Sequence, residues 1–300
     1  MSTIEAMRRR ISTAEDLHSV VRVMKALSAA SVRQYETAVE SLARYAGTVE
    51  AGLQVLLRDR PEALAAAAAE GDRYGVVVFG SDQGMCGAFN ERVAEHALEQ
   101  LAALPGGAGA AAVLAVGARV VGRLQDGGCQ VRATFRTPGA VPGITRAVSA
   151  LLLEVEALRF GEGIDRFLMG HQRPDAGPQA LQLLPLDRAW LDGLAARPWD
   201  SRTVPMFSMD WRVLFSSLVR QHLFVALYRA FAESLASENA ARLASMQAAE
   251  RNIEEHLGEL GLAWQQGRQQ AIQEELLDIV AGFESLADDE RRRGREPGRG

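Results

Sequence analysis

A glycine-rich segment, Gly80-Ser81-Asp82-Gln83-Gly84-Met85-Cys86-Gly87, has the residue types that come closest to small-molecule chemistry in this chain. Glycines that follow an apolar run also occur in dinucleotide-binding loops, where backbone N–H groups meet a pyrophosphate at a helix N-terminus. Here the spacing is GxxxGxxG rather than GxGxxG, no acidic residue stands at the expected distance, and no Gly-Lys-Ser/Thr follows. The segment is therefore predicted to be a tight structural turn that holds no cofactor.

The cysteines and histidines show no pattern of a catalytic or metal centre. Cys86 as a nucleophile would need a neighbouring base, and His96 is the only histidine near it in the sequence. The two cysteines lie 43 positions apart, without CxxC or metal-ligand spacing, which is typical of free thiols in a reducing compartment. We expect a packed thiol, no catalytic residue and no metal site. The histidines without ligand spacing are His18, His96, His171, His222 and His256.

Proline divides the chain into three parts. Nine of the ten prolines fall between Pro61 and Pro205, and none lies in residues 1–60 or 206–296. A proline inside a helix removes a hydrogen bond and clashes with the preceding turn, at about 3 kcal/mol or more, so both ends can form very long helices. The predicted boundaries are 1–60 for an N-terminal coiled-coil helix, 61–205 for a middle domain, 206–287 for a C-terminal coiled-coil helix and 288–300 for a flexible tail.

Both ends carry apolar residues at alternating steps of three and four, the pattern of a helix that packs along another helix. The predicted helices, 3–57 and 208–287, would be about 80 Å and 120 Å long at roughly 1.5 Å per residue, deeper than a domain of this size. They are expected to project and to pair as an antiparallel coiled coil. The apolar overhang of the longer helix, from Ile272 to Leu286, must then be covered by another protein. The stripes include Val32, Tyr35, Val39, Leu42, Val49, Leu53 and Leu56, and then Leu218, Val225, Ala232, Met246, Ile253 and Leu260.

Three polar residues, His18, Lys25 and Ser28, interrupt the N-terminal stripe. In a plain coiled coil, such residues set the register of the two helices. The alternative is that this stretch faces a different and more polar partner.

The middle part alternates short apolar runs with helical patterns, which favours a mainly parallel sheet with helices on its faces. The fold class is therefore predicted as α/β: a long antiparallel coiled coil of the N- and C-terminal helices plus a small, mainly parallel α/β domain. The predicted strands are 74–79, 112–116, 130–135, 164–170 and 180–184, and the predicted helices are 90–104, 118–124 and 144–160.

Charge and hydropathy exclude further classes of protein. The net charge is −5 and the pI about 5.7, without the basic excess of nucleic-acid-binding chains, so no nucleic acid partner is expected. No run approaches the ~18–20 apolar residues that cross a bilayer. The arginine-rich opening also contains acidic residues, unlike a mitochondrial transit peptide. We expect a soluble intracellular chain that meets a membrane only through partner proteins.

Four motifs, in order along the chain, resemble the gamma subunit family of F-type ATP synthases. The segment Gly80–Asn90 is similar to S-S-D-R-G-L-C-G-G-F-N, and Met24–Ser31 follows M-K-M-V-A-A-S-K. In the C-terminal helix, Leu235–Arg242 resembles L-A-S-E-x-A-A-R, and the stretch from Arg268 to Gly282 resembles R-Q-A-A-I-T-x-E-L-x-E-I-V-x-G. The resemblance covers nearly the whole chain.

The resemblance implies a rotor shaft without a catalytic site, because in this family catalysis takes place on the beta subunits. It implies that the coiled coil stands inside a ring of alpha and beta subunits, and that the α/β domain touches the epsilon subunit and the membrane ring of c subunits. It further implies a peripheral position on the cytoplasmic face of the bacterial inner membrane, with Lys25 and Ser28 facing the beta subunits. The residues expected to contact partner subunits are Met24, Lys25, Ser28, Arg242, Arg268, Gln269 and Glu275.

The chain departs from the family pattern where the shaft would meet the ring. Trp264-Gln265-Gln266 replaces Tyr-Asn-Lys, Gln273 replaces threonine, and the chain runs 14 residues past the usual end near Leu286. These departures would suit a divergent, second-copy enzyme. Two alternatives from other classes stay open: a coiled-coil adaptor with an α/β ligand-binding domain, and a nucleotide-dependent oxidoreductase.

Overall fold

The computed structural model describes residues 3–66, 71–199 and 201–293. The chain forms two compact units, each described here by itself. The helical unit combines the chain up to Met24 with the chain from Met246 onward, and the sheet unit runs from Lys25 to Ser245.

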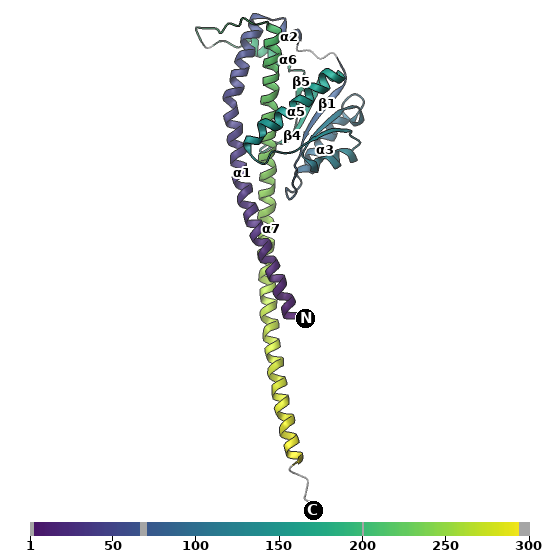
Figure 1. Cartoon of the computed structure of the whole chain (residues 1–300), viewed down its shortest axis with the longest axis vertical. Helices are drawn as coiled ribbons and strands as arrows, with labels where there is room; N and C mark the ends of the chain where they lie inside the picture. Colours follow the sequence, from purple (N-terminus) through teal and green to yellow (C-terminus); the bar gives the residue numbers. More distant parts are fainter. Residues whose placement is uncertain (1–2, 67–70, 200, 294–300) are drawn as a thin grey trace, which may run out of the picture. The chain divides into compact units, whose positions relative to one another are not determined.

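Two long helices form the ends of the chain, as the proline-free stretches predict (Figure 1). Helix α1 spans Thr3–Asp59 with 57 residues, and helix α7 spans Trp211–Arg293 with 83 residues. Helix α7 ends beyond the predicted helix end at 287, and its last residues, Glu290–Arg293, are of types that favour helix.

The two long helices are antiparallel, as predicted. In the sheet unit, the Tyr45 hydroxyl donates a hydrogen bond to Gln221 Oε1 at 2.6 Å, and Gly52 of α1 lies against the side chain of Leu218. Rising residue numbers on α1 therefore meet falling numbers on α7. The predicted stripe is buried in this unit at Tyr35, Leu42, Val49, Leu53 and Leu56 on α1 and at Val225 and Ala232 on α7.

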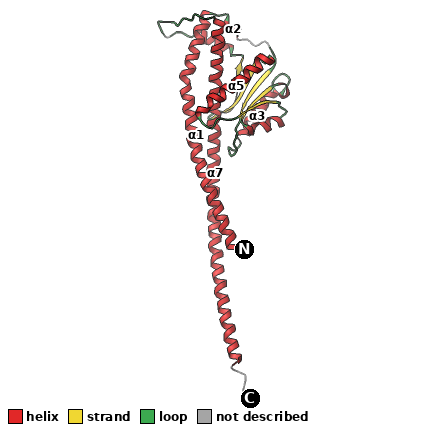
Figure 2. Cartoon of the chain, viewed as in Figure 1, coloured by secondary structure: helices red, strands yellow, loops and turns green. Residues whose placement is uncertain are grey.

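The sheet has five strands in the order β3-β2-β1-β4-β5, and only β5 is antiparallel to its neighbour. This confirms the mainly parallel α/β domain, whose strands are drawn in yellow beside red helices in Figure 2. Strands β4 and β5 are longer than predicted, because backbone pairing continues from Phe167–Leu184 to Arg173–Gly177 through polar residues that carry no apolar signal. The strands are β1 (Tyr74–Phe79), β2 (Ala112–Val116), β3 (Val131–Phe135), β4 (Arg166–Arg173) and β5 (Gly177–Leu184).

Alternate residues of the central strands enter two separate cores, one on each face of the sheet. Val77 and Phe79 of β1 join the core that contains α1, α5 and α7, whereas Val76 and Val78 join the core beneath α3 and α4. The long helices therefore cover one face of the sheet together with α5, which buries Ile144 and other residues at helical spacing. The covering helices are α3 (Phe89–Ala102), α4 (Ala118–Asp126) and α5 (Val141–Glu162).

Three short helical elements were not predicted. They are α2 (Ala63–Ala66), the 3₁₀ turn η1 (Ala108–Ala110) and α6 (Arg188–Ala196). Helix α6 has a sequence signal, because the Asp187 carboxylate accepts a hydrogen bond from the Ala189 N–H at 2.9 Å and caps the helix. Its buried residues, Leu191 and Leu194, lie one turn apart.

Candidate functional site

The glycine-rich segment forms a turn whose polar groups are paired with one another. The Ser81 N–H donates to Asn90 Oδ1 at 2.9 Å, and the Asn90 amide donates to Ser81 Oγ at 2.8 Å. The Ser81 hydroxyl in turn donates to the Gln83 carbonyl at 2.9 Å. Ser81 and Asn90 are buried, so these bonds form away from water and fix the turn to the start of α3. This is the arrangement of a structural turn, as the glycine spacing predicts.

Asp82 ties the same turn to two neighbouring segments. Its carboxylate accepts hydrogen bonds from the Ala118 N–H at 2.9 Å, the Thr137 N–H at 2.8 Å and the Thr137 hydroxyl at 3.0 Å. Ala118 is the first residue of α4, where a negative charge is favoured by the unpaired N–H groups of a helix N-terminus. One carboxylate therefore holds the turn, α4 and the loop after β3 together.

Cys86 is packed into the core, with 2% of its surface exposed. Burial raises the pKa of the Cys86 thiol, and the hydrogen bond with Ser81 opposes this only in part. A thiol with a raised pKa is a poor nucleophile, because the thiolate is the reactive form. The predicted packed thiol is confirmed.

Arg242 of α7 reaches the glycine-rich turn and binds its backbone. Its Nη2 atom donates to the carbonyl oxygens of Gln83 and Gly84, both at 3.3 Å, and to Glu238 Oε1 at 2.6 Å. Arg242 is 7% exposed and Glu238 5% exposed, so the ion pair is buried. Every residue has a backbone carbonyl, so Arg242 recognises the backbone conformation of the turn rather than the side chains of Gln83 and Gly84. We call this group of Arg242, Glu238 and the two carbonyls the turn clasp.

Burial dominates the electrostatics of the turn clasp. It raises the pKa of the Glu238 carboxyl, while the hydrogen bond and the charge of Arg242 oppose the change. Burial also raises the pKa of the Tyr35 hydroxyl, and the negative charge of Glu238 adds to this effect. The Tyr35 hydroxyl of α1 donates to the Pro138 carbonyl at 3.5 Å. The turn clasp therefore lies where α1, α7 and two loops of the α/β domain come together.

A cavity of about 180 Å³ lies between α1, strands β4 and β5, and α7. His171, 1% exposed, approaches Glu233 Oε2 with its Nε2 atom at 2.8 Å. His222 lines the cavity too, and its ring packs on Trp190 of α6 with the ring centroids 4.6 Å apart. Burial lowers the pKa of His222, and the nearby Glu50 carboxylate opposes the shift.

The lowered pKa of His222 predicts a loss of stability in acid. As the pH falls below the ordinary histidine value of 6.5, the unfolded chain binds a proton at this side chain before the folded chain does. The contribution of His222 to the free energy of unfolding is therefore largest above pH 6.5. It falls as the pH drops toward the lower pKa that His222 has in the folded chain. In urea titrations from pH 7.5 to 5.5, His222→Gln should flatten this decline. The control His96→Gln, on α3, where 27% of the side chain is exposed, should leave the decline in place. Equal slopes for wild type and His222→Gln would contradict the prediction.

The residues that the family resemblance marks as partner contacts differ in how exposed they are to solvent. Ser28 is 3% exposed and Arg242 is 7% exposed, so both are enclosed by the chain itself. Ser28 lies on the packed face of α1 and the Arg242 guanidinium binds within the turn clasp, and their contact with partner subunits stays a prediction. Met24 and Lys25 are half-buried. The exposed residues of the set are Arg268, Gln269 and Glu275 on α7.

Sequence reasoning missed Glu238 and Asp82 as functional side chains. The spacing of four between Glu238 and Arg242 is a signal that was available, because such residues are neighbours on a helix. No signal marks the contact with Gln83 and Gly84, since every residue has a backbone carbonyl.

The fold has clear counterparts among solved structures. The rotor of the Euglena gracilis mitochondrial ATP synthase contains a chain with a TM-score of 0.61 and 16% identity, and the match covers 90% of this chain and 99% of that one. A chain of the Tetrahymena thermophila mitochondrial ATP synthase central stalk and c-ring matches with a TM-score of 0.54 and 17% identity, over 77% of this chain and 99% of that one. The fold is thus that of a rotor or central-stalk chain.

Comparison with related sequences identifies the family of the chain. The sequence model of the family described as ATP synthase matches residues 3–286. The ATP synthase gamma chain of Ralstonia nicotianae is 26% identical over 292 residues, and that of an Azoarcus species is 27% identical over 295 residues. Each match covers 94% of this chain and 99% of the relative. The chain therefore belongs to the ATP synthase family, as a gamma chain. Among the described residues, no helix has a long enough apolar stretch to span a membrane.

Proposed function

We propose that the chain is the central shaft of a rotary ATP synthase, which transmits rotation between a membrane ring of c subunits and catalytic beta subunits and has no catalytic site of its own. Its partners are then the alpha and beta subunits of the head, the epsilon subunit and the c-subunit ring. Through them it is held at the cytoplasmic face of a bacterial inner membrane. A solved structure of OSCP, F1 and the c-ring of the Euglena gracilis mitochondrial ATP synthase contains a chain with a TM-score of 0.60 to this one, which supports the proposal.

The main support for the proposal is a set of exposed aliphatic side chains on α7. Leu276 is 57% exposed and Leu277 67% exposed, and adjacent residues of a helix point about 100° apart. Contiguous exposed apolar surface marks a protein interface. A single partner helix would cover one direction only, whereas a surrounding ring of subunits covers several. Further exposed residues of this kind are Leu262, Ile272, Ile279 and Val280 on α7 and Leu17, Val20 and Val23 on α1.

The polar residues among these exposed aliphatics are the proposed points of force transfer. The Arg268 guanidinium lies over the Trp264 ring, 5.6 Å from its centroid, and this contact limits the positions that the arginine can take. Arginine offers a rigid fork of donors for carboxylates, and the amide of Gln269 both donates and accepts. Arg268, Gln269 and Glu275 are proposed to contact a loop of a beta subunit, and Met24 and Lys25 of α1 are proposed to face the beta subunits.

Replacing Arg268 and Gln269 together by alanine should lower the ATP turnover of the assembled complex several-fold and leave assembly intact. Hydrogen bonds to charged groups contribute about 1.5–3 kcal/mol each, enough to favour one rotary orientation. The experiment purifies the complex through a tag on this chain, identifies the subunits that copurify and measures ATP hydrolysis per complex.

The matched control is Arg251→Ala with Asn252→Ala, another adjacent arginine and amide that are exposed on α7. Turnover that falls equally in both double variants would show that the contact is misplaced. If the wild-type chain copurifies with no ATP-hydrolysing head, the shaft assignment itself fails and the adaptor alternative takes its place. A stoichiometric nucleotide site on the isolated chain in calorimetry would instead favour the oxidoreductase alternative.

A further inference from the structure

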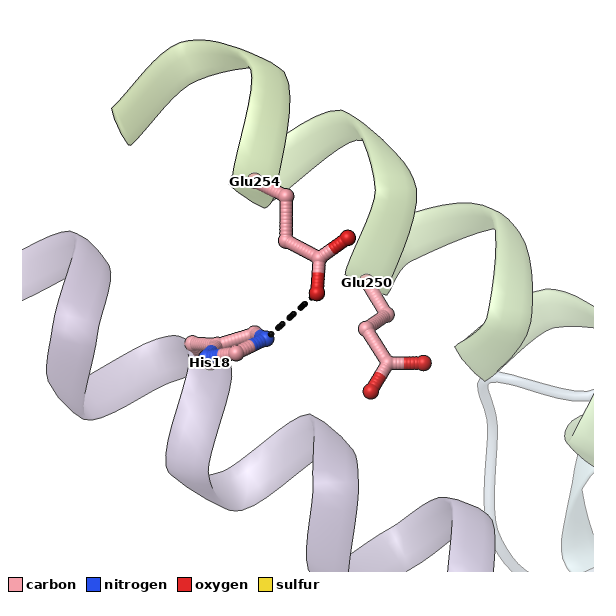
Figure 3. Close-up of side chains that lie close together, drawn as sticks. All are labelled: His18, Glu250 and Glu254. Carbon is pink, nitrogen blue, oxygen red and sulfur yellow. Dashed lines mark hydrogen bonds and ion pairs between the residues drawn. The ribbon is translucent and has the colours of Figure 1, made fainter. Parts of the chain in front are cut away.

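His18 of α1 faces two glutamates of α7 within the helical unit (Figure 3). Its Nε2 atom lies 3.3 Å from Glu254 Oε1, and Glu250 presents a second carboxylate beside them. One possible ligand atom from each of the three residues lies within 4.8 Å of the other two. The three side chains thus surround one point between the two helices.

The spacing of the glutamates explains why both point to the same place. Glu250 and Glu254 are four residues apart, so they lie one above the other on one face of α7. Two carboxylates at this spacing are neighbours on the helix surface, so one cation can contact both. His18 is half-buried, with 23% of its side chain exposed, which limits the ring to positions near the carboxylates.

The donor set selects the type of cation. Mg²⁺ and Ca²⁺ prefer oxygen ligands alone, whereas an imidazole with carboxylates suits Zn²⁺ and related transition metals. Zinc binds histidine nitrogen and carboxylate oxygen at about 2.0–2.2 Å, so its tetrahedral ligand atoms lie about 3.4 Å apart. The pair of His18 and Glu254 already has this spacing, at 3.3 Å. A carboxylate oxygen of Glu250 lies within 4.8 Å of both of these ligand atoms.

We propose that His18, Glu250 and Glu254 bind a divalent transition-metal ion, with Zn²⁺ as the reference ion and water in the fourth position. The bound ion links α1 to α7, two segments more than two hundred residues apart in the sequence. It also gives a reason for the polar interruption of the apolar stripe at His18. The sequence prediction of no metal site rests on spacing along the chain, whereas these three residues come from opposite ends of it. The proposal concerns the chain itself and does not depend on its role as a shaft.

The test is calorimetric titration of the metal-free full chain with ZnCl₂ at pH 7.5, with Mg²⁺ and Ca²⁺ as comparison ions. We expect one Zn²⁺ per chain with a Kd on the order of micromolar, weaker than four-ligand structural zinc sites. At a hundred times that Kd, Zn²⁺ should raise the unfolding midpoint of the chain by a few °C. Replacement of zinc by Co²⁺ should give the visible absorption of a tetrahedral site.

The variants His18→Gln and Glu250→Gln should each weaken zinc binding at least about 10-fold, because each removes a direct ligand. The matched control is His256→Gln, since His256 Nδ1 lies 3.5 Å from Glu259 Oε2 in an exposed pair on α7, and this pair belongs to no three-ligand group among the described residues. Helix content measured by circular dichroism confirms that each variant is folded. An ordinary His18–Glu254 ion pair is the competing explanation. It is supported, and the metal site overturned, if no stoichiometric zinc binds, if His18→Gln binds as wild type does, or if His256→Gln weakens binding equally.

Discussion

Replacement of Arg242 by alanine should destabilise the sheet unit by about 3–5 kcal/mol, the usual effect of removing one partner from a buried ion pair. The variant leaves the Glu238 carboxylate buried without its cation and removes the hydrogen bonds from Arg242 to the carbonyls of Gln83 and Gly84. Unfolding of the full chain by urea, followed by circular dichroism, measures the free energy of unfolding.

Two further variants make this result specific. Arg188→Ala removes an arginine from an exposed pair with Asp192 at the same spacing of four, and it should change the free energy of unfolding by less than about 0.5 kcal/mol. Arg242→Met combined with Glu238→Leu removes both charges and should recover part of the lost stability. If Arg242→Ala is no more destabilising than Arg188→Ala, the turn clasp does not stabilise the unit.

Replacement of Gly117 by alanine should destabilise the same unit by about 3 kcal/mol or more, from backbone strain together with overpacking. Gly117 precedes α4 with a φ of +91°, a conformation that favours glycine. A Cβ atom there would lie 2.6 Å from the Ser81 nitrogen and 2.7 Å from the Gly80 carbonyl carbon. Both are backbone atoms, so the glycine-rich turn itself would have to move.

The control for this substitution lies in the next helix. Gly122 of α4 has open space where a Cβ would stand, so Gly122→Ala should stabilise the unit by about 0.5–1 kcal/mol through helix propensity. Opposite signs for Gly117→Ala and Gly122→Ala in urea unfolding are the expected result. A Gly117→Ala variant as stable as wild type would show that the turn can relax around the new side chain.

The architecture could be predicted from the sequence where the signal is periodic and long. Apolar residues at steps of three and four identify α1 and α7, and alternate burial of the apolar run in β1 suits a strand between two helical layers. The polar ends of β4 and β5 could not be predicted in this way. Their pairing, from Gln172 and Arg173 to Pro178 and Gly177, depends on backbone hydrogen bonds that any residue except proline can donate.

The candidate sites were less predictable than the fold, for a related physical reason. Arg242 belongs to a recognisable motif, but its acceptors are the carbonyls of a distant turn, so the sequence marks the residue without its role. His18 and Glu254 contact each other across 236 positions, a separation at which local spacing carries no information. Only the pairing of the two long helices brings His18 and Glu254 together.

The composition of the larger core has a consequence for how the chain folds during its synthesis. Tyr35 of α1 and Leu227 of α7 contribute to the same core on one face of the sheet, with about 190 residues between them. At 5–20 residues per second, a ribosome needs about 10–40 s to add those residues. Through that interval, α1 and this face of the sheet lack the side chains of α7 that complete their burial. The nascent chain is therefore a natural client for chaperones until its last third has left the ribosome.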